Sequence, residues 1–216
     1  MNDTLEYIIK KYNINPGRQY IIDIPNMGRN DLAALFAELG FKKGVEIGVE
    51  KGNYSEILLK ANPKLHLYSI DPWRASAYEP DIEGVEKRQR KFDEYYKGAK
   101  KRLSAYNCTV IRKESLAALY GFDDNSLDFV YIDANHDFVN FTNDIHYWLK
   151  KIRVGGIVSG HDYAYFPSWK HNHVKRALQA YTRSYRMIPL FIVGGEAVRQ
   201  PGIIRDPFRS WFWVKR

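Results

Sequence analysis

The chain is 216 residues long, with 45% hydrophobic residues, 27% charged residues and a net charge of +8 at pH 7. This length allows one sizeable core, so we expect a core of residues 29–216 with an N-terminal helix and connection, residues 1–28, packed on it. The sequence has no run of about 18 apolar residues, no secretion signal and a single cysteine, which argues against membrane-spanning and disulfide-rich secreted proteins and predicts a cytoplasmic location.

The positive charge is densest between residues 87 and 102. Apolar side chains recur at helical spacing on the opposite face of this segment, which predicts an amphipathic helix. A solvated basic face is the favoured interpretation, and contact with the phosphates of a nucleic acid is the alternative. The sequence does not specify an oligomeric state.

The first half of the chain alternates helix and strand patterns. A helix is expected at residues 3–12, and a second helix is capped at Asn30 or Asp31 and closed by Gly40. Between them, residues 14–26 form a connection punctuated by proline and glycine that contains a short apolar run. The next expected elements are a strand at 44–47, a helix at 54–61 capped at Asn53 or Ser55, and a strand at 65–70.

The second half continues the alternation after the basic helix. Its expected elements are a strand at 108–111, a helix at 116–120, a strand at 127–132, a helix at 140–151, a strand at 157–159 that follows a turn at Gly155 and Gly156, a helix at 171–185, and strands at 187–193 and 210–214. Glycine and proline interrupt the interval between the last two strands, which favours an antiparallel pair. The pattern predicts an α/β fold: a doubly wound, mostly parallel, seven-stranded Rossmann-like sheet with an antiparallel strand pair at the C-terminal end.

Polar residues follow each of the first five expected strands. In open α/β sheets, ligands bind at the carboxyl ends of the strands, so these residues form a candidate site. In chain order they are the segment 46–52, Asp71, Glu114 with Ser115, Asp133 with His136, and His161 with Asp162.

The loop after the first of these strands contains two glycines, Gly48 and Gly52, where the backbone can approach a ligand closely. Asp71, at the next strand end, suits the ribose hydroxyls of either a dinucleotide or S-adenosylmethionine (SAM). The loop lacks the middle glycine of G-x-G-x-x-G and carries Glu46 and Glu50, whose charges would repel a pyrophosphate and attract an ammonium and a sulfonium. The loop therefore favours SAM.

Five motifs together resemble those of the class I SAM-dependent methyltransferases, and most closely the bacterial and phage branch grouped as methyltransferase family 24. They read E-I-G-V-x-x-G at 46–52, S-I-D-P-W at 69–73, L-D-F-V-Y-I-D-x-N-H-D at 127–137, G-G-I-V-S-G-H-D-Y at 155–163 and S-W-F-W-V-K at 210–215. The resemblance covers roughly residues 29–216, which makes this part a SAM-dependent methyltransferase domain.

The resemblance implies a set of cofactor contacts. Glu46 would hold the methionine ammonium through water, the backbone from Gly48 to Gly52 would pass beneath the methionine portion, and Asp71 would bind the ribose. The adenine would lie beside Trp73 or Pro72 and near Glu114 or Ser115, while Asp133 would lie where the methyl group and the acceptor meet. Packing of Trp73 and helix capping by Glu114 are alternatives that depend on no cofactor.

The acceptor side contains a second group of residues. Methyl transfer to oxygen needs an acceptor that is deprotonated by a general base or polarised by a divalent cation. The catalytic candidates are Asp133, His136 and His161, and the resemblance implies Asp133, His161 and Asp162 as ligands of a magnesium ion. Two carboxylates with two histidines nearby would equally suit manganese, iron or zinc. Histidine base catalysis without a metal and a purely structural role stay open as alternatives.

The predicted function is SAM-dependent methylation of a small-molecule or sugar-like acceptor, at oxygen. The first alternative is a protein that binds or modifies nucleic acid, which the net charge permits. The residues after the fourth strand read D-A-N-H rather than the N-P-P-Y or D-P-P-Y of amino-methylating DNA enzymes, which disfavours it. A nicotinamide-dependent, NAD(P)-linked oxidoreductase is the lower alternative, disfavoured by Glu50 and the missing glycine.

Overall fold

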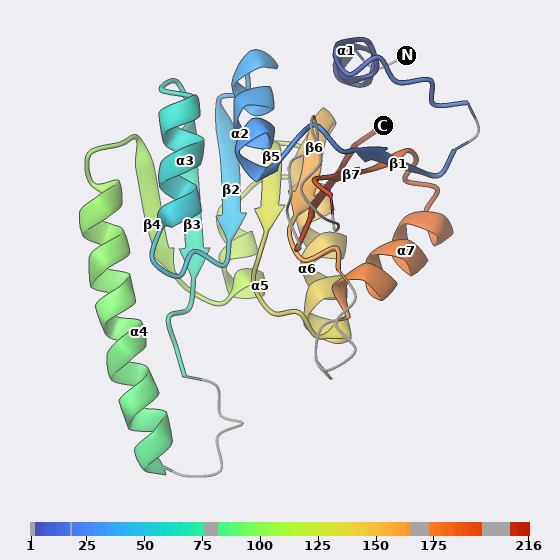
Figure 1. The fold of residues 1–216 in the computed structure, drawn as a ribbon. Coiled ribbons are helices and arrows are strands. Elements are labelled where there is room, and N and C mark those ends of the chain that lie inside the picture. The colour runs from blue at the N-terminus through green and yellow to red at the C-terminus, as the bar shows by residue number, and fades with distance from the viewer. Residues whose placement is uncertain (1–2, 18, 76–81, 165–172, 196–207) are drawn as a thin grey trace.

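The computed structural model of the chain describes residues 3–17, 19–75, 82–164, 173–195 and 208–216, and everything below refers to them (Figure 1). One mixed sheet contains eight strands in the order β1-β7-β8-β6-β5-β2-β3-β4. All neighbours are parallel except β8, which is antiparallel to both β6 and β7. The strands are β1 Ile21–Ile24, β2 Lys43–Ile47, β3 His66–Asp71, β4 Cys108–Arg112, β5 Leu127–Ile132, β6 Ile152–Gly160, β7 Leu190–Val193 and β8 Ser210–Val214.

Helices cover both faces of the sheet. They are α1 Asp3–Lys11, α2 Arg29–Glu38, α3 Asn53–Ala61, α4 Ile82–Leu103, α5 Ser115–Ala118, the 3-10 turn η1 Leu119–Gly121, α6 Phe138–Lys151 and α7 Val174–Ser184. One buried apolar cluster joins α1, α2, α3 and α4 to one face, and a second joins α5, α6 and α7 to the other. This doubly wound arrangement confirms the predicted fold class. No helix of the described chain is both long and apolar enough to span a bilayer.

The sheet contains one strand more than the sequence predicts. β1 pairs in parallel with β7, from Ile21 opposite Leu190 to Ile24 opposite Val193. The sequence assigned this run to a connection, because four residues between proline and glycine carry little strand signal of their own. Pairing with a strand about 170 residues away, visible only in the tertiary structure, makes it a strand.

β6 begins earlier than predicted, at Ile152 rather than residue 157. Gly155 and Gly156, expected to form a turn, lie inside the strand. A Cβ on Gly156 would lie 2.5 Å from the backbone oxygen of Asp128, so glycine here allows close approach to the neighbouring strand.

The expected cap of α3 is also wrong, because its N-cap is Gly52, in the left-handed region with φ of 74°, and neither Asn53 nor Ser55.

The carboxyl ends of β2, β3, β4, β5 and β6 lie along one edge of the sheet, and α4 extends past this edge (Figure 1). β5 is buried over nearly its whole length, with the apolar pattern expected of a strand covered on both faces. The polar residues that follow these five strands therefore meet at this edge, as the sequence predicts.

Candidate functional site

The glycine loop between β2 and α3 runs directly against the end of β5. Gly48 has φ of 87°, and a Cβ on it would lie 2.0 Å from the backbone oxygen of Asp133. The backbone N–H of Asp133 donates to the carbonyl of Ile47 at 2.8 Å, which joins the two strand ends. Only glycine fits at position 48, because any side chain would separate the loop from Asp133.

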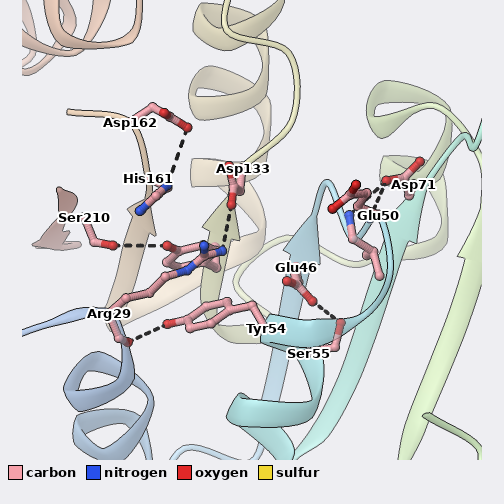
Figure 2. Close-up of polar contacts among 12 residues, drawn as sticks. Arg29, Glu46, Glu50, Tyr54, Ser55, Asp71, Asp133, His161, Asp162 and Ser210 are labelled. Atoms are coloured by element: carbon pink, nitrogen blue, oxygen red, sulfur yellow. Dashed lines mark hydrogen bonds and ion pairs between the residues drawn. The ribbon is translucent and has the colours of Figure 1, made fainter. Parts of the chain in front are cut away.

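Asp71 holds the glycine loop in place. Its Oδ2 accepts hydrogen bonds from the backbone N–H groups of Val49 at 2.9 Å and Glu50 at 3.0 Å (Figure 2). Its Oδ1 accepts from the N–H of Trp73 at 2.7 Å. Oδ2 already accepts two hydrogen bonds, whereas Oδ1 keeps one further lone pair for another donor. Asp71 thus already has a structural task at the position where the ribose contact is expected.

Trp73 lies beneath the loop. Its indole ring is fully buried and packs against Tyr96 at 5.0 Å, while its Nε1–H donates to the carbonyl of Glu50 at 2.7 Å. Packing, one of the two roles considered for Trp73, is therefore observed. The guanidinium of Arg112 donates to the carbonyl of Trp73 at 3.0 Å, so that β4 supports the same turn.

Glu114 and Ser115 point in different directions after β4. Glu114 is exposed, pairs with Arg74 at 3.5 Å, and makes no side-chain hydrogen bond that would cap α5. Ser115 donates to Asp144 at 2.6 Å and accepts from the indole of Trp148 at 2.8 Å. Burial raises the pKa of Asp144 to about 6. The hydroxyl of Ser115 therefore belongs to an internal network on α6.

Glu46 is a buried carboxyl group next to the loop, with 1% of its surface exposed. Ser55 donates a hydrogen bond to it, and Ser69 donates to the hydroxyl of Ser55 at 3.1 Å (Figure 2). Burial raises the pKa of Glu46 to about 8, against the opposing effects of Ser55 and of the charge on Arg29. A nearby ammonium would favour the ionised form.

Arg29, the first residue of α2, also belongs to the site although the sequence did not indicate it. Its Nη2 is 2.7 Å from Oδ2 of Asp133, and its guanidinium lies 4.0 Å from the ring centre of Tyr54 (Figure 2). It is separated from Asp133 by 104 positions and follows β1, which the sequence did not predict as a strand, so the pattern of predicted strand ends could not have revealed it.

Asp133, His136 and Asp162 converge at the ends of β5 and β6. Nε2 of His136 is 2.9 Å from Oδ2 of Asp162 and 3.8 Å from Oδ1 of Asp133. Nε2 is buried, yet no well-aligned hydrogen bond reaches it, so the close contact with Asp162 is an ion pair by distance only. Asp162 has a positive φ of 63°, a strained conformation of the kind found at functional sites.

The charges of this cluster stabilise one another. Burial lowers the pKa of His136, but the carboxylates of Asp133 and Asp162 outweigh burial and raise that pKa to about 9. Burial likewise raises the pKa of Asp162, but His136 and His161 outweigh it and hold that pKa well below its usual range. At neutral pH a protonated His136, together with the guanidinium of Arg29 at 2.7 Å from Asp133, therefore balances the two carboxylates.

The same three residues form a possible metal centre. One ligand atom from each of Asp133, His136 and Asp162 lies within 4.8 Å of the others. The sequence named His161 as the third ligand, but its Nδ1 lies 3.5 Å from Oδ2 of Asp162, and its ring lies 6.1 Å from that of Phe208 (Figure 2). His161 therefore contacts the cluster through Asp162, while His136, in the loop after β5, provides the third ligand atom beside Asp133 and Asp162.

The chain matches the sequence model of a family described as a methyltransferase domain over residues 45–163. Solved structures with a similar fold include the O-methyltransferase from Bacillus cereus in complex with SAH, at 15% identity and a TM-score of 0.58, covering 100% of this chain and 92% of that one. Another is TomG from Streptomyces achromogenes, an O-methyltransferase involved in tomaymycin synthesis and solved with SAM, at 18% identity and a TM-score of 0.57, covering 100% and 91%. A putative caffeoyl-CoA O-methyltransferase from Staphylococcus aureus has 15% identity and a TM-score of 0.56, covering 98% and 91%.

No curated protein sequence matches the chain significantly. The structural similarities, all at low identity, establish the fold. The family match spans more than half of the chain and contains the glycine loop, Asp71, the Asp133–His136 segment and Asp162. The chain therefore belongs to methyltransferase family 24 and is a class I SAM-dependent methyltransferase.

Proposed function

We propose that this enzyme methylates an oxygen atom of a small-molecule or sugar-like acceptor. The observation that carries the proposal is the convergence of Asp133, His136 and Asp162 beside the glycine loop, at 2.9 and 3.8 Å from Nε2 of His136. The O-methyltransferase activity named for the structural neighbours supports oxygen as the acceptor atom. Methyl transfer to a hydroxyl requires removal of its proton, and this cluster has the groups to assist it.

The cofactor contacts in this proposal come from the loop and its neighbours. When bound, SAM supplies a methyl group activated by a positive sulfonium. Glu46 would attract the ammonium, the backbone at Gly48 and Gly52 would let the methionine portion approach, and Asp71 would accept the ribose hydroxyls. Gly48 brings this loop directly against the backbone of Asp133, beside the proposed acceptor side. The adenosine would lie beside the turns after β3 and β4, where Glu114 is exposed, whereas the side chains of Trp73 and Ser115 are engaged within the protein.

Of the two ways to activate the acceptor, the cluster favours a divalent cation. A histidine with a pKa of about 9 carries its proton at neutral pH, so His136 in this state cannot accept another from a hydroxyl, whereas a metal ion would displace that proton when it binds. Two carboxylates and an imidazole nitrogen without a hydrogen-bond partner match the ligands of a metal ion. When bound there, such an ion would lower the pKa of the acceptor hydroxyl, and the nitrogen ligand favours manganese over magnesium. His161 would then border the acceptor.

Calorimetric titration with Mn²⁺ and Mg²⁺ tests the metal centre without an acceptor. The wild type should bind one Mn²⁺. Asp162→Asn and His136→Gln should each lower the affinity for Mn²⁺ by at least roughly tenfold and leave the affinity for S-adenosylhomocysteine unchanged. His146→Gln is the matched control, because His146 lies on α6 and contacts Tyr181 at 3.2 Å. Equal Mn²⁺ binding by all four proteins would contradict the metal centre and leave histidine catalysis.

The acceptor atom requires a separate assay. A panel of hydroxyl, amine and thiol compounds, with duplex DNA and RNA, would be incubated with SAM labelled in its methyl group. We expect transfer to small-molecule or sugar-like hydroxyls. His136→Ala and Asp162→Ala should lower the rate of transfer far more than they lower the affinity for the cofactor. Transfer to amines or nucleic acid alone would overturn the proposal.

A further inference from the structure

Arg29 is held rigidly at the methionine side of the glycine loop. Its guanidinium lies 4.0 Å from the ring centre of Tyr54 and 5.0 Å from that of Tyr131, two buried tyrosines whose own rings are 4.4 Å apart. Tyr54 donates its hydroxyl to the carbonyl of Arg29 at 2.9 Å, and the hydroxyl of Tyr131 lies 3.1 Å from that of Ser210 (Figure 2). Both the backbone and the head group of Arg29 are therefore fixed before any ligand arrives.

The guanidinium of Arg29 has more hydrogen-bond donors than the described residues use. Nη2 contacts Oδ2 of Asp133 at 2.7 Å, but Nε is buried and has no hydrogen-bond partner among the described residues. The side chain of Arg29 is 28% exposed, so a ligand can reach it. A buried donor without a partner costs free energy, and a guanidinium has five donors suited to a carboxylate.

The order of the strands indicates which part of the cofactor Arg29 faces. β2 lies between β3 and β5, so that Asp71 and Asp133 lie on opposite sides of the glycine loop. If Asp71 holds the ribose, the amino-acid portion extends toward Glu46 and Asp133, where Arg29 lies. That portion is a zwitterion, and Glu46 provides an acidic group for its ammonium but nothing for its α-carboxylate.

Other cations near the loop are engaged elsewhere. Lys51 is 3.6 Å from the carboxylate of Glu50 and 4.7 Å from the ring of Tyr95. Arg112 donates to the carbonyl of Trp73 and pairs with Asp93. Both lie toward α4, on the side of the loop where adenosine is expected.

We propose that Arg29 binds the α-carboxylate of SAM, and that Arg29 and Glu46 together recognise the amino-acid zwitterion. The inference rests on the cofactor contacts proposed above and is independent of the acceptor and of the metal. Arg29 is then a positioning residue: it fixes the methionine end so that the sulfonium and its methyl group face Asp133. The alternative is that Arg29 serves only to neutralise the negative charge of Asp133.

Two ligands that differ by one carboxylate separate these roles. S-adenosylhomocysteine and its decarboxylated analogue, the corresponding amine, are titrated calorimetrically into the wild type, Arg29→Gln and Arg29→Lys. We expect Arg29→Gln to lower the affinity for S-adenosylhomocysteine roughly 10- to 100-fold and the affinity for the amine by less than about threefold. The affinities of Arg29→Lys should lie between those of the wild type and Arg29→Gln. Arg153→Gln is the matched control, because Arg153 also pairs with an aspartate, Asp128 at 2.7 Å, and lies 5.3 Å from the ring of Phe41.

The outcomes are distinguishable. If the wild type binds neither ligand, the proposed cofactor site fails. If it binds both with equal affinity, the carboxylate is not recognised and the inference about Arg29 alone is overturned, even if the variants do not fold. If folded Arg29→Gln loses the same affinity for both ligands, Arg29 does not recognise the carboxylate and serves only to pair with Asp133.

Discussion

At the scale of single residues, Glu46 links the cofactor site to the stability of the protein. The folded protein holds a proton on Glu46 up to a pKa of about 8, because burial disfavours the charge, whereas the unfolded chain releases it near 4.5. Between these values the folded state binds more protons, so this group makes the free energy of unfolding fall as pH rises.

The prediction concerns Glu46→Gln, which keeps an acceptor for Ser55 but cannot ionise. Relative to this variant, the wild type should lose on the order of a few kcal/mol of stability between pH 5 and pH 8. Urea unfolding of both proteins at several pH values measures the difference and cancels the other titrating groups. Parallel stability profiles would show that Glu46 ionises normally in the folded protein.

Gly48 provides a second residue-scale prediction. Gly48→Ala places a Cβ against the Asp133 carbonyl, at a positive φ, and should cost about 2–4 kcal/mol of stability and remove most affinity for S-adenosylhomocysteine. Gly98→Ala is the control: Gly98 lies within α4 with no atom within 4 Å of its added Cβ, and should stabilise by about 0.5–1 kcal/mol. Chemical denaturation and calorimetry check both. A Gly48→Ala protein of normal stability would mean that the loop is free to move away from β5.

At the scale of elements, Asp128 joins the amino ends of three strands. Its Oδ2 accepts from the backbone N–H groups of Lys42 at 2.7 Å and Lys43 at 2.9 Å, and its Oδ1 accepts from Arg153 at 2.7 Å. It therefore ties β2 and β6 to β5 at the edge opposite the site.

Asp128→Ala should destabilise the fold by about 1–3 kcal/mol while leaving cofactor affinity unchanged, because it removes three hydrogen bonds far from the loop. Asp124→Ala, which removes an exposed ion pair with Lys151 at 2.8 Å, should cost less than about 1 kcal/mol. Urea denaturation and titration with S-adenosylhomocysteine measure the two effects. Loss of affinity in Asp128→Ala would mean that the two edges of the sheet are coupled.

At the scale of the whole molecule, the cofactor should stabilise the folded chain. At a concentration of about 100 times its Kd, S-adenosylhomocysteine should add about 2.7 kcal/mol, which for a protein of this size raises Tm by roughly 5–10 °C. NADH at the same concentration should leave Tm unchanged, because Glu50 and the missing glycine disfavour a pyrophosphate. Differential scanning calorimetry tests both, and a shift with NADH alone would favour the oxidoreductase alternative.

The overall charge of +8 is only partly available to a polyanion. Within α4, Arg102 pairs with Glu56 at 2.9 Å, and the neighbouring Arg112 pairs with Asp93. Lys97 and Lys100 on the same helix are exposed. These observations agree with the solvated basic face that the sequence favours, and a steep salt dependence of binding to duplex DNA would argue for the alternative.

Local pattern determined most of the fold. β5 has the predicted bounds, β2 and β3 lie within one residue of theirs, and the pairing of β7 with β8 is antiparallel as expected. These elements were predictable because a continuous apolar run, or a loop rich in glycine and proline, carries its signal within a few neighbours. The same holds for Asp71, Asp133 and Asp162, since each lies within three residues of the end of a strand that the apolar pattern identifies.

The tertiary structure decided what depends on contacts between distant segments. β1 is a strand only because β7 offers it a partner, and Gly156 is a strand residue only because Asp128 lies against it. His136 rather than His161 completes the acidic cluster, because the loop after β5 turns it toward Asp162. Arg29 reaches Asp133 through the packing of α2 beside two tyrosines, a juxtaposition that arises only when helix and sheet are assembled.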